Sequence, residues 1–274
     1  MTAPSPPPSL PDIGPVRVPH RLFSTPRAIV ALVLREMSTT YGRSPGGYIW
    51  AVLEPAAGIA LLTAIFSIGF RSPSLGNNFA IYYATGILPF YLYVMTSNVV
   101  MQSVMFSRQL LAYPSVTFID AILARFLLQL LTQLLVSYIL FSFIISLFDT
   151  RTSLEFNRLL LGYAMAAGLG LGVGTFNCFL RSMFPVWQQV WGILTRPLLL
   201  VSGIIFLHEN IPDPYRSWLE YNPLVHVVGV TRTAFYPYYN AEYVAPIYVF
   251  AIALIALVFG LVFLRRYKYD ILYR

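Results

Sequence analysis

The chain has 274 residues, of which 57% are hydrophobic and 11% charged, and its net charge is +7. Soluble domains carry roughly 25% charged residues, so the composition excludes an ordinary soluble protein and indicates a membrane protein. Cys178 is the only cysteine, and the three histidines lack metal-ligand spacing. An intrachain disulfide is therefore impossible, and we predict no metal site.

Residues 1–25 contain seven prolines, a density that favours extended backbone over a packed structure. We expect a disordered tail there, followed by one membrane domain over residues 26–274. Residues 26–44 predict an amphipathic helix, with Ile29, Val33 and Met37 among the apolar residues on one side. Leu32 interrupts this pattern and Glu36 lies at its margin. Such a helix can lie in the plane of the membrane interface.

Six segments are long and apolar enough to cross a bilayer, which takes about 20 residues. They cover residues 46–69, 79–105, 121–147, 156–180, 186–207 and 244–264. The fifth is interrupted by Arg196 and Pro197. The segment 208–243 is rich in prolines and aromatics and is too polar to span twice, so we expect short re-entrant gate helices there. The predicted fold is an all-α integral membrane protein.

The arginines and lysine between these spans predict the orientation, because cytoplasmic loops carry an excess of them. With the N-terminus inside, twelve lie on the cytoplasmic side and five outside, and Arg196 is unassigned. We therefore expect both termini in the cytoplasm. The excess positive charge is explained by topology, so we expect membrane lipids and no nucleic acid as partners.

Several polar groups lie where lipid would not tolerate them. Glu54 and Pro55 enter the first span, and the third span carries a polar stripe of Arg125, Gln129, Thr132 and Gln133. Such groups face protein or a water-filled path. For Glu54 a structural bond, for instance to Arg125, is slightly favoured over a place at the mouth of a pathway. For the stripe the two alternatives are equal.

An aromatic stripe runs along the second span and includes Tyr83, Phe90 and Tyr93. Core packing or an interfacial belt explains its outer members. Phe90 and Tyr93 lie deeper, where stacking against sugar rings is a minority hypothesis. In the fourth span, Gly168 with Gly172 and Gly170 with Gly174 form two G-x-x-x-G pairs that favour close helix packing.

The chain has one lysine, Lys268, and lacks the G-x-x-x-x-G-K-[ST] phosphate-binding loop. It is therefore not expected to hydrolyse ATP itself. If transport is driven by ATP, another polypeptide must supply the nucleotide site.

Three stretches carry a resemblance to a known family: REMSTTYGRSPGGYIWAVLEP at 35–55, SRQLLAYPSVTFIDAILAR at 107–125, and LTRPLLLVSGIIFLHENIP with YNPLVHVVGVTRTAFY within 194–236. The sequence resembles the membrane subunit of ABC-2-type exporters, and most closely the permease of bacterial capsule polysaccharide exporters. The resemblance implies an inner-membrane subunit that pairs with itself and with two copies of an ATP-binding subunit carrying ATP and Mg. It also implies export of a lipid-linked polysaccharide together with periplasmic and outer-membrane export proteins.

The resemblance also implies roles for particular residues. Contact with the ATPase would involve Arg35, Glu36, Arg108, Tyr113, Pro114 and Asp120. From the buried polar and aromatic groups themselves, and not from the resemblance, we predict a translocation path that involves Glu54, Tyr83, Phe90, Tyr93, Arg125, Gln129 and Arg196, with the two arginines attracting anionic groups or forming ion pairs. A periplasmic gate would involve Trp218, Tyr221, Tyr236, Tyr238 and Tyr239.

Two alternatives stay open. The same kind of permease can carry another cargo, such as O-antigen, teichoic acid, a lipid or a drug. A membrane-embedded transferase is a weaker alternative, because Glu54 stands alone within the membrane and neither His208 nor His226 has a recognisable active-site context.

Overall fold

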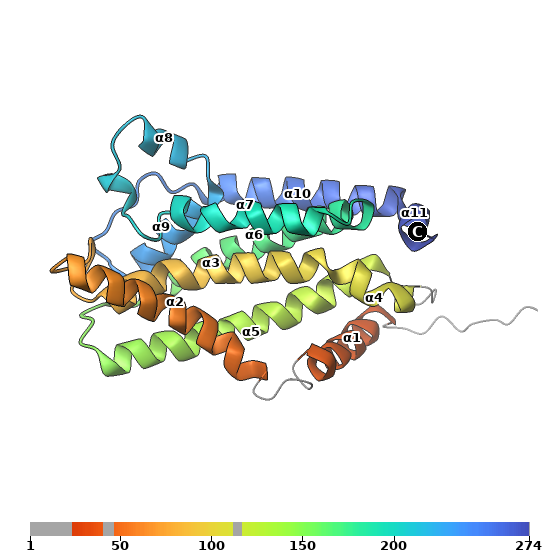
Figure 1. The fold of residues 1–274 in the computed structure, drawn as a ribbon, viewed down its shortest axis with the longest axis horizontal. Coiled ribbons are helices and arrows are strands. Elements are labelled where there is room, and N and C mark those ends of the chain that lie inside the picture. Colours follow the sequence, from red (N-terminus) through yellow and green to blue (C-terminus); the bar gives the residue numbers. More distant parts are fainter. Residues whose placement is uncertain (1–23, 41–46, 112–116, 274) are drawn as a thin grey trace, which may run out of the picture.

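The computed structural model describes residues 24–40, 47–111 and 117–273, which form helices and connecting turns and contain no β-strand. The predicted tail at residues 1–25 lies almost wholly outside this described part. Figure 1 shows a lengthwise bundle of six helices. They are α2 (Gly47–Gly69), α3 (Phe79–Met101), α5 (Phe118–Leu147), α6 (Phe156–Met183), α7 (Trp187–Val201) and α10 (Pro246–Arg266).

The shorter helices mark the two ends of this bundle. At one end, hereafter the α1 end, lie α1 (Ser24–Thr40), α4 (Ser103–Leu111) and α11 (Lys268–Tyr273). At the opposite end, the α8 end, lie the short 3₁₀ helix η1 (His208–Asn210), α8 (Tyr215–Leu219) and α9 (Pro223–Phe235). The first and last described helices therefore share one end of the bundle.

Five helices of the described chain are long and apolar enough to cross a membrane: α2, α3 continued into α4, α5, α6 and α10. The predicted segment at 186–207 forms only the 15-residue helix α7. It stops at Val201 because Gly203, with a φ of +72°, reverses the chain immediately afterwards. At 1.5 Å per residue α7 covers about 22 Å, less than the hydrocarbon thickness of about 30 Å.

The core of the bundle lies around α3. In the most apolar stretch of α3 and its continuation 78% of the residues are buried, against 11% in the corresponding stretch of α2 and 22% in that of α10. The G-x-x-x-G prediction is confirmed by the packing of α6. A Cβ on Gly172 would lie 2.1 Å from the carbonyl oxygen of Ala253 in α10, and one on Gly174 would lie 2.8 Å from the side chain of Val100 in α3. The two glycine pairs thus let two neighbouring helices approach α6.

The predicted amphipathic helix is present as α1, but its docking face differs from the expected one. Leu32 and Glu36, one turn apart, are the buried side chains, whereas Val30, Leu34 and Met37 are exposed. The residues that disturbed the apolar pattern are therefore those that pack against the bundle. These apolar side chains are exposed in the described chain, and the place of α1 at a membrane interface stays a prediction.

Candidate functional site

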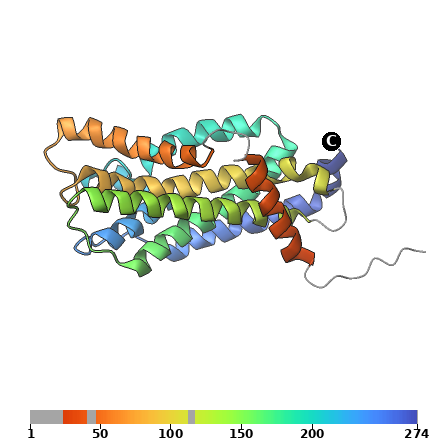
Figure 2. The ribbon, with the colours of Figure 1, turned by 90° about the horizontal axis from the view of Figure 1, so that it is seen from below.

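A cleft of about 480 Å³ lies between α2, α3 and α7. Figure 2 shows α2 and α7 on the same side of α3, so that α3 forms the floor between them. The lining is mostly apolar and aromatic, with Glu54, Phe90, Tyr91, Val94, Met95, Thr195, Arg196, Leu199 and Leu200. A concave apolar surface with a few polar groups is the usual form of a ligand site.

The cleft brings together two opposite charges that are separated by 142 residues in the sequence. Glu54 comes from α2 and Arg196 from α7, and both are exposed. Neither forms an ion pair with any residue in the described part of the chain. Because these two charges have no ion-pair partner in the described chain, they need water, a partner chain or a polar ligand if they lie at membrane depth.

The other residues predicted for a path are placed differently. Phe90 and Tyr93, 5% and 4% exposed, both belong to the hydrophobic core, and of the two only Phe90 also lines the cleft. Gln129, Thr132 and Gln133 are buried on α5, so this polar stripe faces the interior of the bundle. The lining of the cleft includes none of Tyr93, Gln129, Thr132 and Gln133.

Tyr83 lines a second, smaller pocket of about 160 Å³ near the α8 end. Its ring centre lies 5.5 Å from that of Phe66 and 6.4 Å from that of Phe79. Ser72, Ser74 and Asn210 add polar groups to the same pocket, and no charged residue lines it.

A buried ion pair at the α1 end joins α1 to α5. Arg125 donates from Nε and Nη2 to Oε1 of Glu36, at 3.0 and 2.5 Å, and the two side chains are 10% and 7% exposed. The Arg125 guanidinium also lies 4.4 Å from the ring centre of Phe106 in α4, and Arg35 lies over the same ring at 5.4 Å. Three helices therefore meet around one aromatic ring.

This arrangement corrects two expectations. The partner of Arg125 is Glu36, not Glu54, and Arg125 does not line the cleft. Glu36 does not face outward towards an ATPase, because its carboxylate is enclosed between α1 and α5. Arg35, its neighbour, is partly exposed.

The segment between α4 and α5 was predicted to contact an ATPase. Tyr113 and Pro114 lie outside the described residues, and Arg108 lies in the last turn of α4. Asp120 is confirmed as an acid in the first turn of α5, where it completes a capping box with Thr117. Its Oδ2 accepts from the Thr117 backbone N–H at 2.9 Å and from the hydroxyl at 2.8 Å, which fixes the start of α5.

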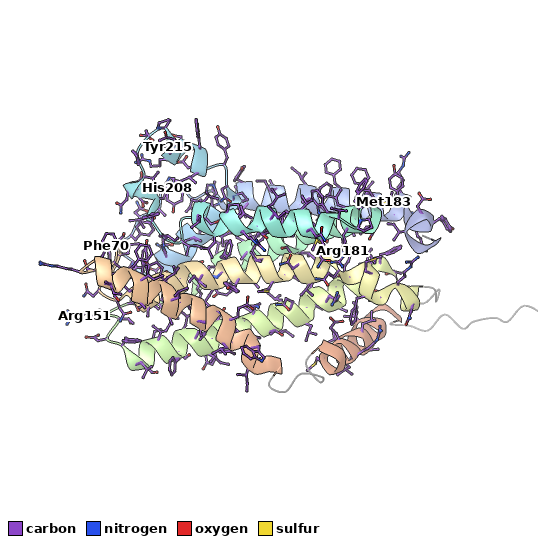
Figure 3. The ribbon with its side chains drawn as sticks, in the orientation of Figure 1. Phe70, Arg151, Arg181, Met183, His208 and Tyr215 are labelled. Atoms are coloured by element: carbon purple, nitrogen blue, oxygen red, sulfur yellow. The ribbon has the colours of Figure 1, made fainter. Side chains whose placement is uncertain are left out.

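The five predicted gate residues divide into two groups at the α8 end. Trp218, Tyr221 and Tyr238 are exposed, whereas Tyr236 and Tyr239 are buried. In Figure 3, Tyr215 and His208 mark the part of this segment that projects from the bundle, while Arg181 and Met183 lie towards the α1 end of the bundle.

Partly buried polar contacts hold this outer segment together. The hydroxyl of Tyr239 donates to Glu209 at 2.8 Å and lies 3.3 Å from that of Tyr243. Burial raises the pKa of Tyr243 to about 12, and burial also raises the pKa of Tyr239. The two histidines are used in the same structural way: His208 contacts Glu220 at 3.1 Å, and His226 bonds to the Glu220 carbonyl and the Ala245 amide.

Comparison with known proteins decides the family. The family model described as ABC-2 type transporter matches residues 27–236. The chain belongs to the ABC-2 type transporter family. It is 34% identical over 238 residues to the polysialic acid transport protein KpsM of Escherichia coli, covering 86% of this chain and 92% of that protein.

Two further relatives of this ABC-2 protein have related names. The capsule polysaccharide export inner-membrane protein CtrC of Neisseria meningitidis serogroup B is 23% identical over 242 residues, and BexB of Haemophilus influenzae, with the same description, is 25% identical over 243. Each alignment covers 88% of this chain and 91% of the relative.

Sequence reasoning missed one residue of this ABC-2 protein that the structure makes prominent. Arg232 was counted with the external loop charges, yet it is 1% exposed and lies in α9. Its signal was an arginine within the apolar stretch PLVHVVGVTRTAF. Within the described residues, no three His, Cys, Asp or Glu side chains gather into a metal site.

Proposed function

We propose that this chain is the membrane-spanning permease subunit of an ATP-driven exporter that moves lipid-linked capsular polysaccharide across the bacterial inner membrane. Family membership and the printed functions of KpsM, CtrC and BexB support this cargo. Hydrolysis of ATP with Mg would take place on a separate ATP-binding subunit, because the chain contains no phosphate-binding loop. Periplasmic and outer-membrane export proteins would receive the polymer.

The observation that carries the proposal is the cleft with two charges that have no ion-pair partner among the described residues. Glu54 and Arg196 give it polar groups, and Phe90 and Tyr91 give it ring faces. Arg196 can attract the negative charge of an acidic glycan or of its anionic lipid linker, Glu54 can accept hydrogen bonds from sugar hydroxyls, and the rings can contact apolar sugar faces. Many weak contacts of this kind hold a polymer without trapping it.

The proposed topology has six crossings with both termini in the cytoplasm. In this arrangement α7 and the turn after it form the fifth crossing, and the described segment 208–240 forms the gate on the periplasmic side. Both α1 and α11 lie at one end of the bundle, which fits an even number of crossings. Arg265, Arg266 and Lys268 lie at that same end, as the distribution of positive charge in cytoplasmic loops favours.

The proposed assembly contains two copies of this chain and two ATP-binding subunits. A second copy would face α2 and α7, whose apolar side chains are widely exposed in the single chain; examples are Ile49, Trp50, Leu61, Ile193, Leu194 and Leu200. Such a pairing would enclose the cleft and shield Glu54 and Arg196 from lipid. The unpaired charges are then tolerable, because they line a shared conduit.

Coupling to the ATPase would pass through the α1 end. The segment from Arg108 to Asp120, including Tyr113 and Pro114, would dock on the ATP-binding subunit, with Arg35 at its edge. The buried Glu36–Arg125 pair would then act from behind this surface by joining α1 to α5. Nucleotide shifts the conformational equilibrium only through its different affinities for the two states.

Reconstitution tests the proposal directly. The chain is purified with its ATP-binding partner in lipid nanodiscs, and hydrolysis is measured with lipid-linked acidic polysaccharide, O-antigen lipid, teichoic acid and a simple amphiphile. We expect the acidic polysaccharide to stimulate hydrolysis most and Arg196→Gln to remove that stimulation. The matched control is Arg158→Gln, which changes an exposed arginine at the α8 end. Equal stimulation by all four compounds would refute the assignment of cargo.

A further inference from the structure

The backbone carbonyls at the end of α7 need hydrogen-bond donors from outside the helix. The last four carbonyls of a helix have no partner within it, and here the chain turns inward, with Ser202, Gly203 and Ile204 all buried. Buried carbonyls need donors from elsewhere. A Cβ on Gly86 of α3 would lie 3.2 Å from the Ile204 side chain, so this turn packs directly on the central helix.

The Ser202 hydroxyl donates to the Leu198 carbonyl, and three side chains from outside this segment donate to the Val201 carbonyl at the end of α7 and to carbonyls in the turn after it. Asn222 donates from its amide to the Val201 carbonyl at 3.0 Å, while its Oδ1 accepts from the Leu224 N–H and caps α9. Arg232 donates from Nη2 to the Ile204 carbonyl at 2.9 Å, and Tyr82 donates to the Ile205 carbonyl at 3.4 Å. The donors come from both ends of α9 and from α3.

Arg232 stands out among the three because it carries a charge. Its guanidinium lies 4.4 Å from the ring centre of Tyr82, and no carboxylate in the described part of the chain pairs with it. Its charge is therefore balanced by a carbonyl dipole and a π face. One side chain thus links the turn after α7, the face of α3 and the last turn of α9.

The opposite end of α7 is held more weakly by side chains. There the Trp187 indole donates one hydrogen bond to Asn177 of α6 at 3.0 Å. No residue of α7 is buried, although Trp191 and Leu198 pack partly against the core. The cleft lies beside Thr195, Arg196, Leu199 and Leu200, immediately before the anchored turn. The attachment of this helix is therefore asymmetric along its length.

We propose that Arg232 is the positioning residue that holds the α8 end of α7 against α3, so that the cleft widens only at its α1 end. The role of the cleft in this statement rests on the proposed function, but the asymmetry of attachment does not. With the α8 end of the cleft fixed, α7 swings about the turn at 202–205, as a hinge at the end of an element allows. A substrate then enters from the α1 end while the other end stays closed.

Hydrogen–deuterium exchange of the full chain in nanodiscs tests this asymmetry without any glycan. In the wild type we expect residues 187–193 to exchange faster than residues 198–206. Arg232→Met should raise exchange in 198–206 about tenfold or more and abolish the gradient. Arg232→Lys, which keeps the charge but loses the planar fork, should give an intermediate increase. Arg216→Met, on the neighbouring α8, is the matched control and should change neither region.

Two milder variants keep the test valid if Arg232→Met does not fold. Tyr82→Phe removes the donor to Ile205 and keeps the ring beneath Arg232, and Asn222→Asp keeps the cap of α9 and removes the donor to Val201. Each should raise exchange in 198–206 by a smaller factor without exposing α9. With the ATP-binding partner and a non-hydrolysable nucleotide, changes should concentrate in residues 187–193.

A wild-type chain with equal protection at both ends of α7, or an Arg232→Met chain with unchanged exchange in 198–206, would overturn the proposal. If the glycan does not stimulate ATP hydrolysis by the wild-type complex, the proposed function is refuted, whereas the exchange result is unaffected. The two failures are therefore distinguishable.

Discussion

Breaking the Glu36–Arg125 pair should release α1 from the bundle. Glu36→Ala leaves a guanidinium that is 10% exposed without its carboxylate. Removal of one partner from a buried ion pair costs roughly 3–5 kcal/mol, because the other charge stays buried. Since α1 packs chiefly on α5, this cost should fall on the docking of α1 and spare the six-helix bundle.

The magnitude can be read from amide exchange. A loss of about 3 kcal/mol raises the population of undocked α1 about 150-fold, since each 1.4 kcal/mol is a factor of ten. We expect faster exchange over residues 24–40 of Glu36→Ala in nanodiscs, with α3 and α6 unchanged. Glu155→Ala is the control: its pair with Arg158 has side chains that are 42–45% exposed, and exposed pairs contribute about 1 kcal/mol or less.

A double-mutant cycle sharpens this test. In Glu36→Leu with Arg125→Leu both charges are absent, so much of the penalty of a single change should disappear. The reasoning is refuted if α1 in Glu36→Ala exchanges within about twofold of the wild type, or if the two single changes add without coupling.

Three further predictions follow from other parts of the chain. Glu54→Gln should reduce export without lowering thermal stability, because the carboxylate is exposed and unpaired in the described chain. A variant whose melting temperature falls together with its export would contradict this. Gly172→Ala should destabilise the chain by about 1–3 kcal/mol, since its Cβ would overlap the Ala253 carbonyl of α10. Gly168→Ala should be tolerated, because its Cβ would meet Phe250 at 3.6 Å. Thermal unfolding in detergent compares the two variants. The outer segment should be stable below about pH 10 and lose stability as the pH rises above it, because the pKa values of buried Tyr239 and Tyr243 are higher than those of tyrosines in the unfolded chain. Tyr239→Phe should reduce this pH dependence, which is measured by unfolding between pH 9 and pH 11.

The sequence was sufficient to predict the helices because apolar length and interruption are local properties. All six predicted segments are helical, and the boundaries of α2 and α10 agree within two residues. The segment at 186–207 was predicted too long, although the Ser202–Gly203 pair that ends α7 was visible as a break. Local pattern identifies such a break, but it does not say on which side of it the helix stops.

The pairings within the site were harder to predict. Glu36 and Arg125 are 89 residues apart, and their contact depends on which face of α1 packs on α5. The available signs of that face were Leu32, which interrupts the apolar pattern, and Glu36, which lies at its margin. The aromatic stripe of α3 had the same ambiguity, because periodicity shows that Phe90 and Tyr93 share a side of the helix but does not show that both pack in the core and that only Phe90 also borders the cleft.

The burial of α9 has a consequence for how the protein is made. Every residue from Leu224 to Phe235 is buried, and Gly229 lies against Tyr243 and Val244 just before α10 begins. At 13 residues the helix is too short to be threaded across a bilayer as a separate span. Its covering includes α10, which leaves the ribosome after it. Completion of this region must therefore wait until α10 has been synthesised, and a chain truncated before residue 246 would be left with an apolar helix that lacks part of its covering.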